Sequence, residues 1–333
     1  MSSAVLLPAS FAILLAGALL FTNAIEWLGA KLELGQGAVG SLLAAVATAL
    51  PESLIPIIAI VGGAAGSEEV ATGAILGAPF MLATIAMALV GLSAIVWRRR
   101  RRQGLALDVH FPTLERDLAF FFVCFAAAFL LGLFGPPLTV RIVAAVALVL
   151  AYAGYVRWTL AHSGEVEAES ELQPLVMDRT RGDPPRMRIV LLQCAVALGA
   201  IIGGAHLFVE QIVETAEAVG VEPLVLSLVI APFATELPEK ANSVFWVRDG
   251  KDTLALGNIT GAMVFQSTLP VAFGLAFTEW DFETASIVAC SLGLAGGLLA
   301  IFELQRRRRF LGRAVVVWAA LFAAFVLYVS ATA

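Results

Sequence analysis

Long apolar runs, each bounded by charged or turn-forming residues, are the feature that most constrains this chain. Hydrophobic residues make up 60% of its 333 residues and charged residues only 14%, a balance too apolar for the surface of an ordinary soluble domain. The runs are about 20 residues long, enough for a helix to cross roughly 30 Å of hydrocarbon. The alternation of an outer-membrane barrel is absent, so the sequence predicts an all-α membrane protein in a lipid bilayer.

The runs predict ten transmembrane helices. We place them at residues 4–28, 37–62, 69–97, 116–134, 138–157, 187–211, 221–247, 253–278, 283–304 and 311–330. The first run lacks the basic region and small-residue cleavage site of a removable signal, so we expect it to be retained as the first span.

The basic residues predict the orientation. With ten spans, nineteen of the 21 Lys and Arg fall on one side of the membrane; Arg141 is on the other side and Lys240 lies within a span. By the positive-inside rule the basic side is cytoplasmic, so we expect a multi-pass protein of the cell (inner) membrane with both termini extracytoplasmic. The Arg98–Arg102 and Arg306–Arg309 clusters then need no nucleic-acid partner, because anionic lipid explains them.

An internal repeat divides the chain. An offset of 187 residues superposes A-T-A-L-P-E (47–52) on A-T-E-L-P-E (234–239) with five identities in six positions. Each half then has five spans, and an odd number inserts the second half upside down, which gives two inverted five-helix repeats with broken helices carrying the site. We assign residues 1–158 to the first repeat, 159–186 to a cytoplasmic linker and 187–333 to the second repeat. The linker is acidic and then rich in Pro and Arg, which indicates a solvated segment.

The repeated segment contains the oxygen ligands of a hard cation. A proline in a helix cannot donate to the carbonyl four residues back, so each proline frees one backbone oxygen, and each threonine shares a helical face with the glutamate four residues later. Two carboxylates, two hydroxyls and two carbonyls suit a divalent cation such as Ca²⁺. The alternative is a protonated helix-packing contact between the glutamates. The candidate ligands are Glu52, Thr48 and Ala47 in the first half and Glu239, Thr235 and Ala234 in the second.

At these residues the chain resembles the sodium/calcium exchangers of the cation/calcium antiporter superfamily. The family's G-T-S-L-P-E-like and G-N-x-x-G-S-N-like segments correspond to 47–52 and 73–79 in the first half and to 234–239 and 257–263 in the second. The resemblance implies that Glu52 and Glu239 bind Ca²⁺, with Thr48 and Thr235 in support, and that an antiporter exchanges Ca²⁺ for Na⁺ or H⁺ by alternating access. It implies inorganic cations as partners, no cofactor and no enzymatic activity. Gly73 and Gly77 would let the third span pack closely on a broken helix, and the glycines at 257 and 261 would do so for the eighth span.

Departures from the family pattern leave the coupling ion open. The serine after the family's threonine is Ala49 in one half and Glu236 in the other, and a later Asn or Asp ligand corresponds to Leu82 and Gln266. Several oxygens expected for Na⁺ are therefore missing, which favours H⁺, whereas the family name favours Na⁺. Glu236 either joins Glu239 in the cation site or forms an ion pair with Lys240 four residues on.

Two other functional classes agree less well with the sequence. An intramembrane enzyme would need a motif such as H-E-x-x-H, paired catalytic aspartates or a Ser/His pair within the spans. A passive cation channel does not explain an inverted repeat with a shared site at the midplane. The sequence does not determine the oligomeric state or the choice among divalent cations.

Overall fold

The computed structural model describes residues 3–32, 50–63, 65–162, 172–178, 184–307, 310–311 and 314–332. Helices make up almost all of the described chain. The elements of the first half are α1 (Ser3–Lys31), α3 (Leu50–Gly62), α4 (Ser67–Met81), the π-helix η1 (Leu82–Ala86), α5 (Met87–Val96), β1 (Ala106–Leu107), α6 (Phe111–Phe134) and α7 (Leu138–His162). The elements of the second half are α8 (Met187–Val219), α9 (Pro223–Thr235), α10 (Leu237–Arg248), α11 (Asp252–Gln266), α12 (Leu269–Phe277), α13 (Thr284–Arg307), β2 (Phe310–Leu311) and α14 (Val315–Thr332).

The apolar runs form helices long enough for a bilayer. In the described residues, eight helical segments have the length and hydropathy of a membrane span, and two shorter apolar helices cover Glu52–Gly62 and Pro223–Phe233. Large apolar side chains stay exposed along the outer helices, including Val143 at 65% and Leu150 at 66%, because lipid is as favourable for them as a protein interior. The prediction of an all-helical membrane protein is confirmed.

Among the described residues, three helical segments are interrupted partway along their length. The α9–α10 pair separates at Glu236, and α11–α12 separates at Ser267 and Thr268. Pro238 and Pro270 lie in the first turn after these breaks, where the missing N–H of proline costs no helical hydrogen bond. In the first half, α4 and α5 continue through the π-helical turn η1, a geometry that often occurs at functional sites.

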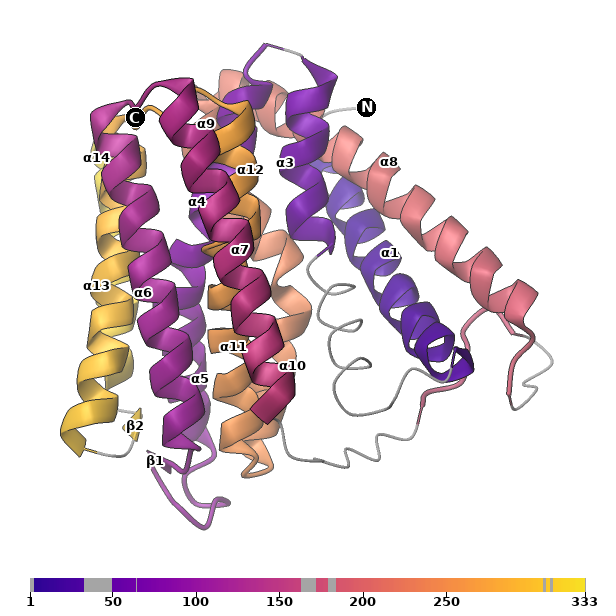
Figure 1. The fold of residues 1–333 in the computed structure, drawn as a ribbon, viewed down its shortest axis with the longest axis vertical. Coiled ribbons are helices and arrows are strands. Elements are labelled where there is room, and N and C mark those ends of the chain that lie inside the picture. The colour runs from indigo at the N-terminus through magenta and orange to yellow at the C-terminus, as the bar shows by residue number, and fades with distance from the viewer. Residues whose placement is uncertain are drawn as a thin grey trace.

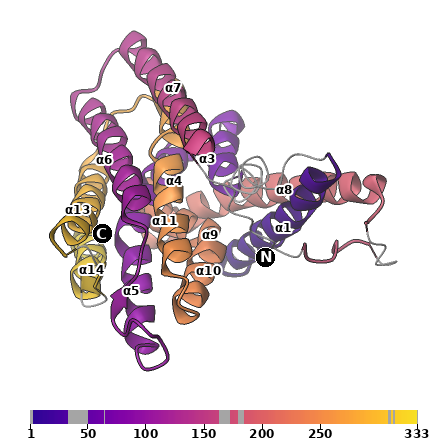
Figure 2. The same ribbon diagram turned by 60° about the horizontal axis from the view of Figure 1, so that its bottom comes forward.

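The helices form a bundle with one pair set apart. Helices α1 and α8 pack on each other and extend to one side of the remaining helices in both views (Figures 1 and 2). The first helix begins and the last helix ends at the end of the molecule opposite the antiparallel β1–β2 pair (Figure 1). The arginine-rich turn that follows α5 therefore lies at the end opposite the chain termini.

Two glycines bring α4 into backbone contact with α9. A Cβ atom on Gly73 or Gly77 would overlap with the carbonyl oxygens of Leu224 and Leu228 in α9. The Ser227 hydroxyl donates to the Val70 carbonyl at 2.7 Å across the same interface. The close packing predicted for the third span is thus present, and it fixes α9, the first half of the broken helix α9–α10, to α4. The same prediction for the eighth span is wrong within the described residues, because a Cβ on Gly257 or Gly261 would meet none of their atoms within 4 Å.

We expect Gly77→Ala to destabilise the fold by about 1–3 kcal/mol, because the added methyl group forces two backbones apart in a packed interface. The measurement is the melting temperature of the purified protein in mild detergent. Gly154→Ala in α7 is the matched control, since a Cβ there meets no atom within 4 Å. Equal melting temperatures for the two variants would show that α4 and α9 separate easily.

Part of the linker is not solvated, contrary to the sequence-based expectation. Residues 172–178 lie against α1 and α8, where the Trp27 indole donates to the Gln173 carbonyl at 2.8 Å. The Gln193 side chain accepts from the Met177 N–H at 2.8 Å, and Leu175 is only 5% exposed. A single apolar side chain and a few hydrogen bonds within a polar stretch give no periodic pattern, so composition could not indicate this contact.

Candidate functional site

The predicted ligands are described unevenly. The structure gives the side chains of Glu52, Thr235, Glu236 and Gln266 and the backbone of Ala234. Ala47, Thr48 and the side chain of Glu239 lie outside the described residues. Within the described part, no three His, Cys, Asp or Glu side chains gather as a metal cluster. The meeting of Glu52 and Glu239 therefore stays a prediction.

Glu52 is a buried carboxylate at the start of an apolar helix. It lies in the first turn of α3 and is 8% exposed. Ile55, one turn further on, belongs to the same buried apolar cluster as Ala231 of α9. An ionisable group at this depth costs a few kcal/mol unless it has a partner, so such residues usually mark function.

Thr235 lies where α9 ends, one turn beyond Ala231. Its side chain is 7% exposed, and its hydroxyl donates to the Ala231 carbonyl at 3.2 Å. Pro238 has no N–H to give to the Ala234 carbonyl four residues earlier. The helix break thus leaves a hydroxyl oxygen and a backbone oxygen next to each other in the sequence, four and five residues before Glu239.

Glu236 forms an ion pair inside the protein. The Lys240 Nζ lies 2.6 Å from Glu236 Oε2, and the two side chains are 5% and 3% exposed, respectively. The same Nζ donates to the Pro232 carbonyl at 3.4 Å. Of the two roles open for Glu236 at the sequence level, the structure contains the pairing with Lys240.

The residues at the family's later ligand position mark helix irregularities. Gln266 is the last residue of α11 and is 3% exposed. Leu82 is the first residue of η1 and is fully buried. Both halves are therefore irregular at this position, but only Gln266 has a side-chain oxygen that a cation can bind.

Asp117 is a buried carboxylate that we did not single out from the sequence. It lies in α6 at 2% exposure and accepts from Tyr155 at 2.7 Å, from Arg116 at 2.7 Å and from Thr260 of α11 at 3.0 Å. These donors satisfy the carboxylate, so its role is to hold α6, α7 and α11 together. An aspartate at the very start of a predicted span was the signal that could have revealed it.

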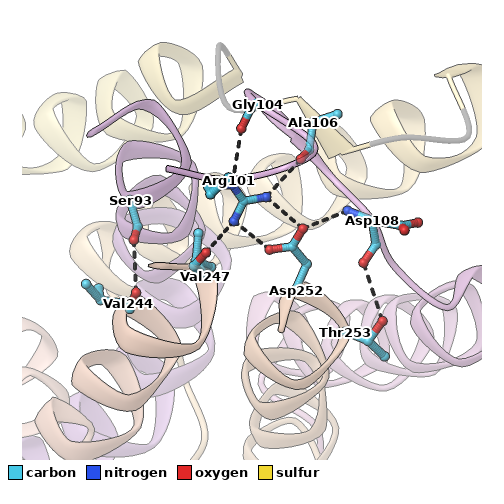
Figure 3. A network of polar contacts seen from close by, with 9 residues as sticks. All are labelled: Ser93, Arg101, Gly104, Ala106, Asp108, Val244, Val247, Asp252 and Thr253. Atoms are coloured by element: carbon cyan, nitrogen blue, oxygen red, sulfur yellow. Dashed lines mark hydrogen bonds and ion pairs between the residues drawn. The ribbon is translucent and has the colours of Figure 1, made fainter. Parts of the chain in front are cut away.

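The end of the bundle with the arginine-rich turn is fastened by Arg101. Its guanidinium binds both carboxylate oxygens of Asp252 at 2.6 and 2.7 Å and the Val247 carbonyl at 2.5 Å (Figure 3). Ser93 of α5 adds a 3.0 Å hydrogen bond to the Val244 carbonyl of α10 (Figure 3). The α4–η1–α5 segment therefore supports both halves of the broken helix, α9 through the glycines and α10 through these contacts.

The opposite end of the bundle carries an acidic cavity. It has a volume of about 540 Å³ and is lined on α4 and the α12–α13 connection by Glu68, Glu69, Glu279, Asp281 and Glu283. The Glu279 N–H donates to Glu68 at 2.9 Å, which joins the two segments. A cavity lined by one sign of charge raises the local concentration of counter-ions, so this opening favours cations over anions.

The interrupted helices and buried carboxylates within apolar spans define a multi-pass helical membrane protein of the secondary-transporter type. The chain belongs to the sodium/calcium exchanger protein family, whose sequence model matches residues 2–161 and 189–331. The predicted resemblance is thereby confirmed.

Curated relatives are distant. The putative antiporter CaxA of Alkalimonas amylolytica is 28% identical over 112 residues, 34% of this chain and 35% of that protein. The sodium/calcium exchanger MaX1 of Methanosarcina acetivorans is 30% identical over 124 residues, 35% of this chain and 34% of that protein. The uncharacterized membrane protein MJ0091 of Methanocaldococcus jannaschii is 25% identical over 75% of this chain and 73% of that protein. Thus the chain aligns with only about a third of the length of the two relatives named for transport.

Solved structures share the fold. The crystal structure of the H⁺/Ca²⁺ exchanger CAX superposes with a TM-score of 0.75 at 21% identity, covering 98% of this chain and 82% of that one. The sodium-calcium exchanger NCX_Mj soaked with Na⁺ and Sr²⁺ gives a TM-score of 0.60 at 19% identity, covering 98% and 97%. At these identities the likeness concerns the fold alone.

Proposed function

We propose that the protein is a secondary antiporter that moves Ca²⁺ across the membrane in exchange for Na⁺ or H⁺. The observation that carries the proposal is the buried Glu52 at the start of α3, in the first copy of a motif whose second copy ends at Glu239. Membership of the exchanger family supports this function. In the proposed site, Thr48, Thr235, the carbonyls of Ala47 and Ala234, and Gln266 add oxygen ligands to the two carboxylates.

The proposed architecture is ten spans in two inverted repeats. The two shorter apolar helices α3 and α9 would each be half of a broken span, with α10 as the second half of the α9 span. That assignment places both termini outside and the arginine-rich turns inside. The site would then become accessible from one side of the membrane and afterwards from the other, as the two repeats move relative to each other.

The coupling ion is Na⁺ or H⁺, and different observations support each. The family name supports Na⁺. Two observations support H⁺. The carboxylate of Glu236 is paired with Lys240, and Leu82 has no side-chain oxygen, so fewer oxygens are left for a Na⁺ ion. A passive cation channel is the remote alternative, and counter-ion dependence distinguishes it from exchange.

Calcium flux in proteoliposomes tests the proposal. With radioactive Ca²⁺ and the membrane potential held at zero by an ionophore, we expect uptake that saturates and depends on either an outward Na⁺ gradient or an outward H⁺ gradient. Each gradient is imposed separately, so the same experiment identifies the coupling ion. Uptake that needs neither gradient and does not saturate would indicate a channel. If no uptake occurred under either gradient, the proposal of Ca²⁺ exchange would be wrong.

A further inference from the structure

The ion pair between Glu236 and Lys240 lies at the break of the α9–α10 helix. Glu236 lies between the last residue of α9 and the first residue of α10, and both Glu236 and Lys240 are buried. Glu239, a proposed Ca²⁺ ligand, directly precedes Lys240 in the sequence. The pair is thus built into the backbone that carries the proposed site.

The lysine nitrogen contacts two oxygens of the kinds that bind small cations. It donates to the carboxylate oxygen Glu236 Oε2 at 2.6 Å and to the Pro232 carbonyl oxygen at 3.4 Å. The second carboxylate oxygen, Glu236 Oε1, is buried without a hydrogen-bond partner in the described part of the chain. A carboxylate and a backbone carbonyl at a helix break are the oxygen types that bind cations in transporters with broken helices.

A carboxylate in this position must either take up a proton or have a positive partner, because an isolated charge away from water is strongly unfavourable. The partner can come from solution or from the chain. Here the chain supplies it, since the four-residue spacing and the Glu-then-Lys order let the ammonium group reach back along α10.

We propose that the Lys240 Nζ occupies a binding position for a monovalent cation, so that Glu236 takes up no ion from solution. This role rests on the proposed exchange function and makes Lys240 a determinant of the coupling ratio. For each Ca²⁺, the protein exchanges one monovalent cation fewer than a variant with a small neutral residue at position 240. The cavity left by a small residue at position 240 would accept Na⁺ or methylammonium.

Cation-dependent melting tests the proposal without any transport measurement. Purified full-length Lys240→Ala is melted in mild detergent without Ca²⁺, at fixed pH and ionic strength, in choline chloride, NaCl or methylammonium chloride. We expect Na⁺ or methylammonium to raise its melting temperature over choline by about 3 °C or more, because a ligand of the folded state stabilises it. Wild type should show no such shift in methylammonium, and any shift in NaCl should be smaller than that of Lys240→Ala, because Na⁺ bound at other positions would stabilise both proteins equally.

Two matched variants locate the effect. Lys240→Met fills the same space with a neutral chain, and Glu236→Gln with Lys240→Ala removes the carboxylate while leaving the space, so neither should respond to the choice of cation more than wild type does. If Lys240→Ala responds no more than these controls, the proposal is wrong. If Lys240→Ala can be purified only in Na⁺ or methylammonium, the proposal is supported. If neither Lys240→Ala nor Lys240→Ser can be purified in any salt while the double variant can, free cations do not replace the ammonium group. The proposal is then wrong.

The flux assay separates this inference from the proposed function. In proteoliposomes, Lys240→Ala should carry one more monovalent cation per Ca²⁺ than wild type, seen as a change in the gradient that balances Ca²⁺ flux. Absence of Ca²⁺ exchange by wild type would remove the exchange function and the coupling role, while a cation-specific melting shift would still establish the cation position. Unchanged coupling in an active Lys240→Ala protein would overturn the role in coupling alone.

Discussion

Glu52→Gln should reduce Ca²⁺ exchange by roughly 100-fold or more while the protein remains folded. The substitution keeps the size of the side chain but removes the negative charge, and losing a charge-assisted ligand worth about 3 kcal/mol corresponds to about two orders of magnitude in binding. Glu239→Gln should have the same effect, because the repeat makes the two carboxylates equivalent. The measurement is the initial rate of radioactive Ca²⁺ uptake into proteoliposomes under the gradient that drives wild-type exchange.

Glu217→Gln is the matched control for this experiment. Glu217 is an exposed residue in the last turns of α8, so the same chemical change there should leave the uptake rate unchanged. Melting temperatures of all three variants report whether they fold. If a folded Glu52→Gln or Glu239→Gln protein exchanged Ca²⁺ at the wild-type rate, the proposed role of the two carboxylates would be wrong.

The helical membrane fold could be predicted because lipid leaves the backbone few choices. Once runs of about 20 apolar residues are present, internal hydrogen bonding requires helices, and the structure contains them. The proline of the repeated segment was also informative, since Pro238 lies in the first turn after a helix break, whereas Pro56, Pro79 and Pro232 lie inside continuous helices. The motif around Glu239 indicated the family, which the sequence model confirms.

Features that depend on three-dimensional partners could not be predicted from the sequence. Nothing in the run Arg98–Arg102 distinguishes Arg101, yet only its contact with Asp252 explains a buried guanidinium in a polar turn. The π-helical turn at Leu82 packs closely against α13, where a Cβ on Gly296 would overlap with the Ala83 carbonyl, and no local pattern in the sequence indicates this contact. The pairing of Glu52 with Glu239 remains a prediction, because it joins segments 187 residues apart in the sequence.

Arg101→Met should produce the largest loss of stability among the substitutions considered outside the site. Both side chains of the Arg101–Asp252 pair are 0% exposed, and removing one partner of a buried ion pair leaves an uncompensated charge at a cost of about 3–5 kcal/mol. Arg101 also gives up its hydrogen bonds to three backbone carbonyls, those of Gly104, Ala106 and Val247. The free energy of unfolding, from denaturant titration in micelles, measures the effect.

A nearby surface pair provides the control for Arg101. Arg248 and Asp249 form an ion pair at 2.9 Å with side chains 35% and 49% exposed, and the hydrogen bond from Arg248 lowers the pKa of Asp249. Water and salt screen such a pair, so Arg248→Met should leave stability nearly unchanged. Arg101→Met with Asp252→Asn removes both buried charges and should be less destabilised than the sum of the single variants. Strict additivity would mean that α5 is held to α10 and α11 by the backbone hydrogen bonds and packing, and that the charges contribute nothing to that attachment.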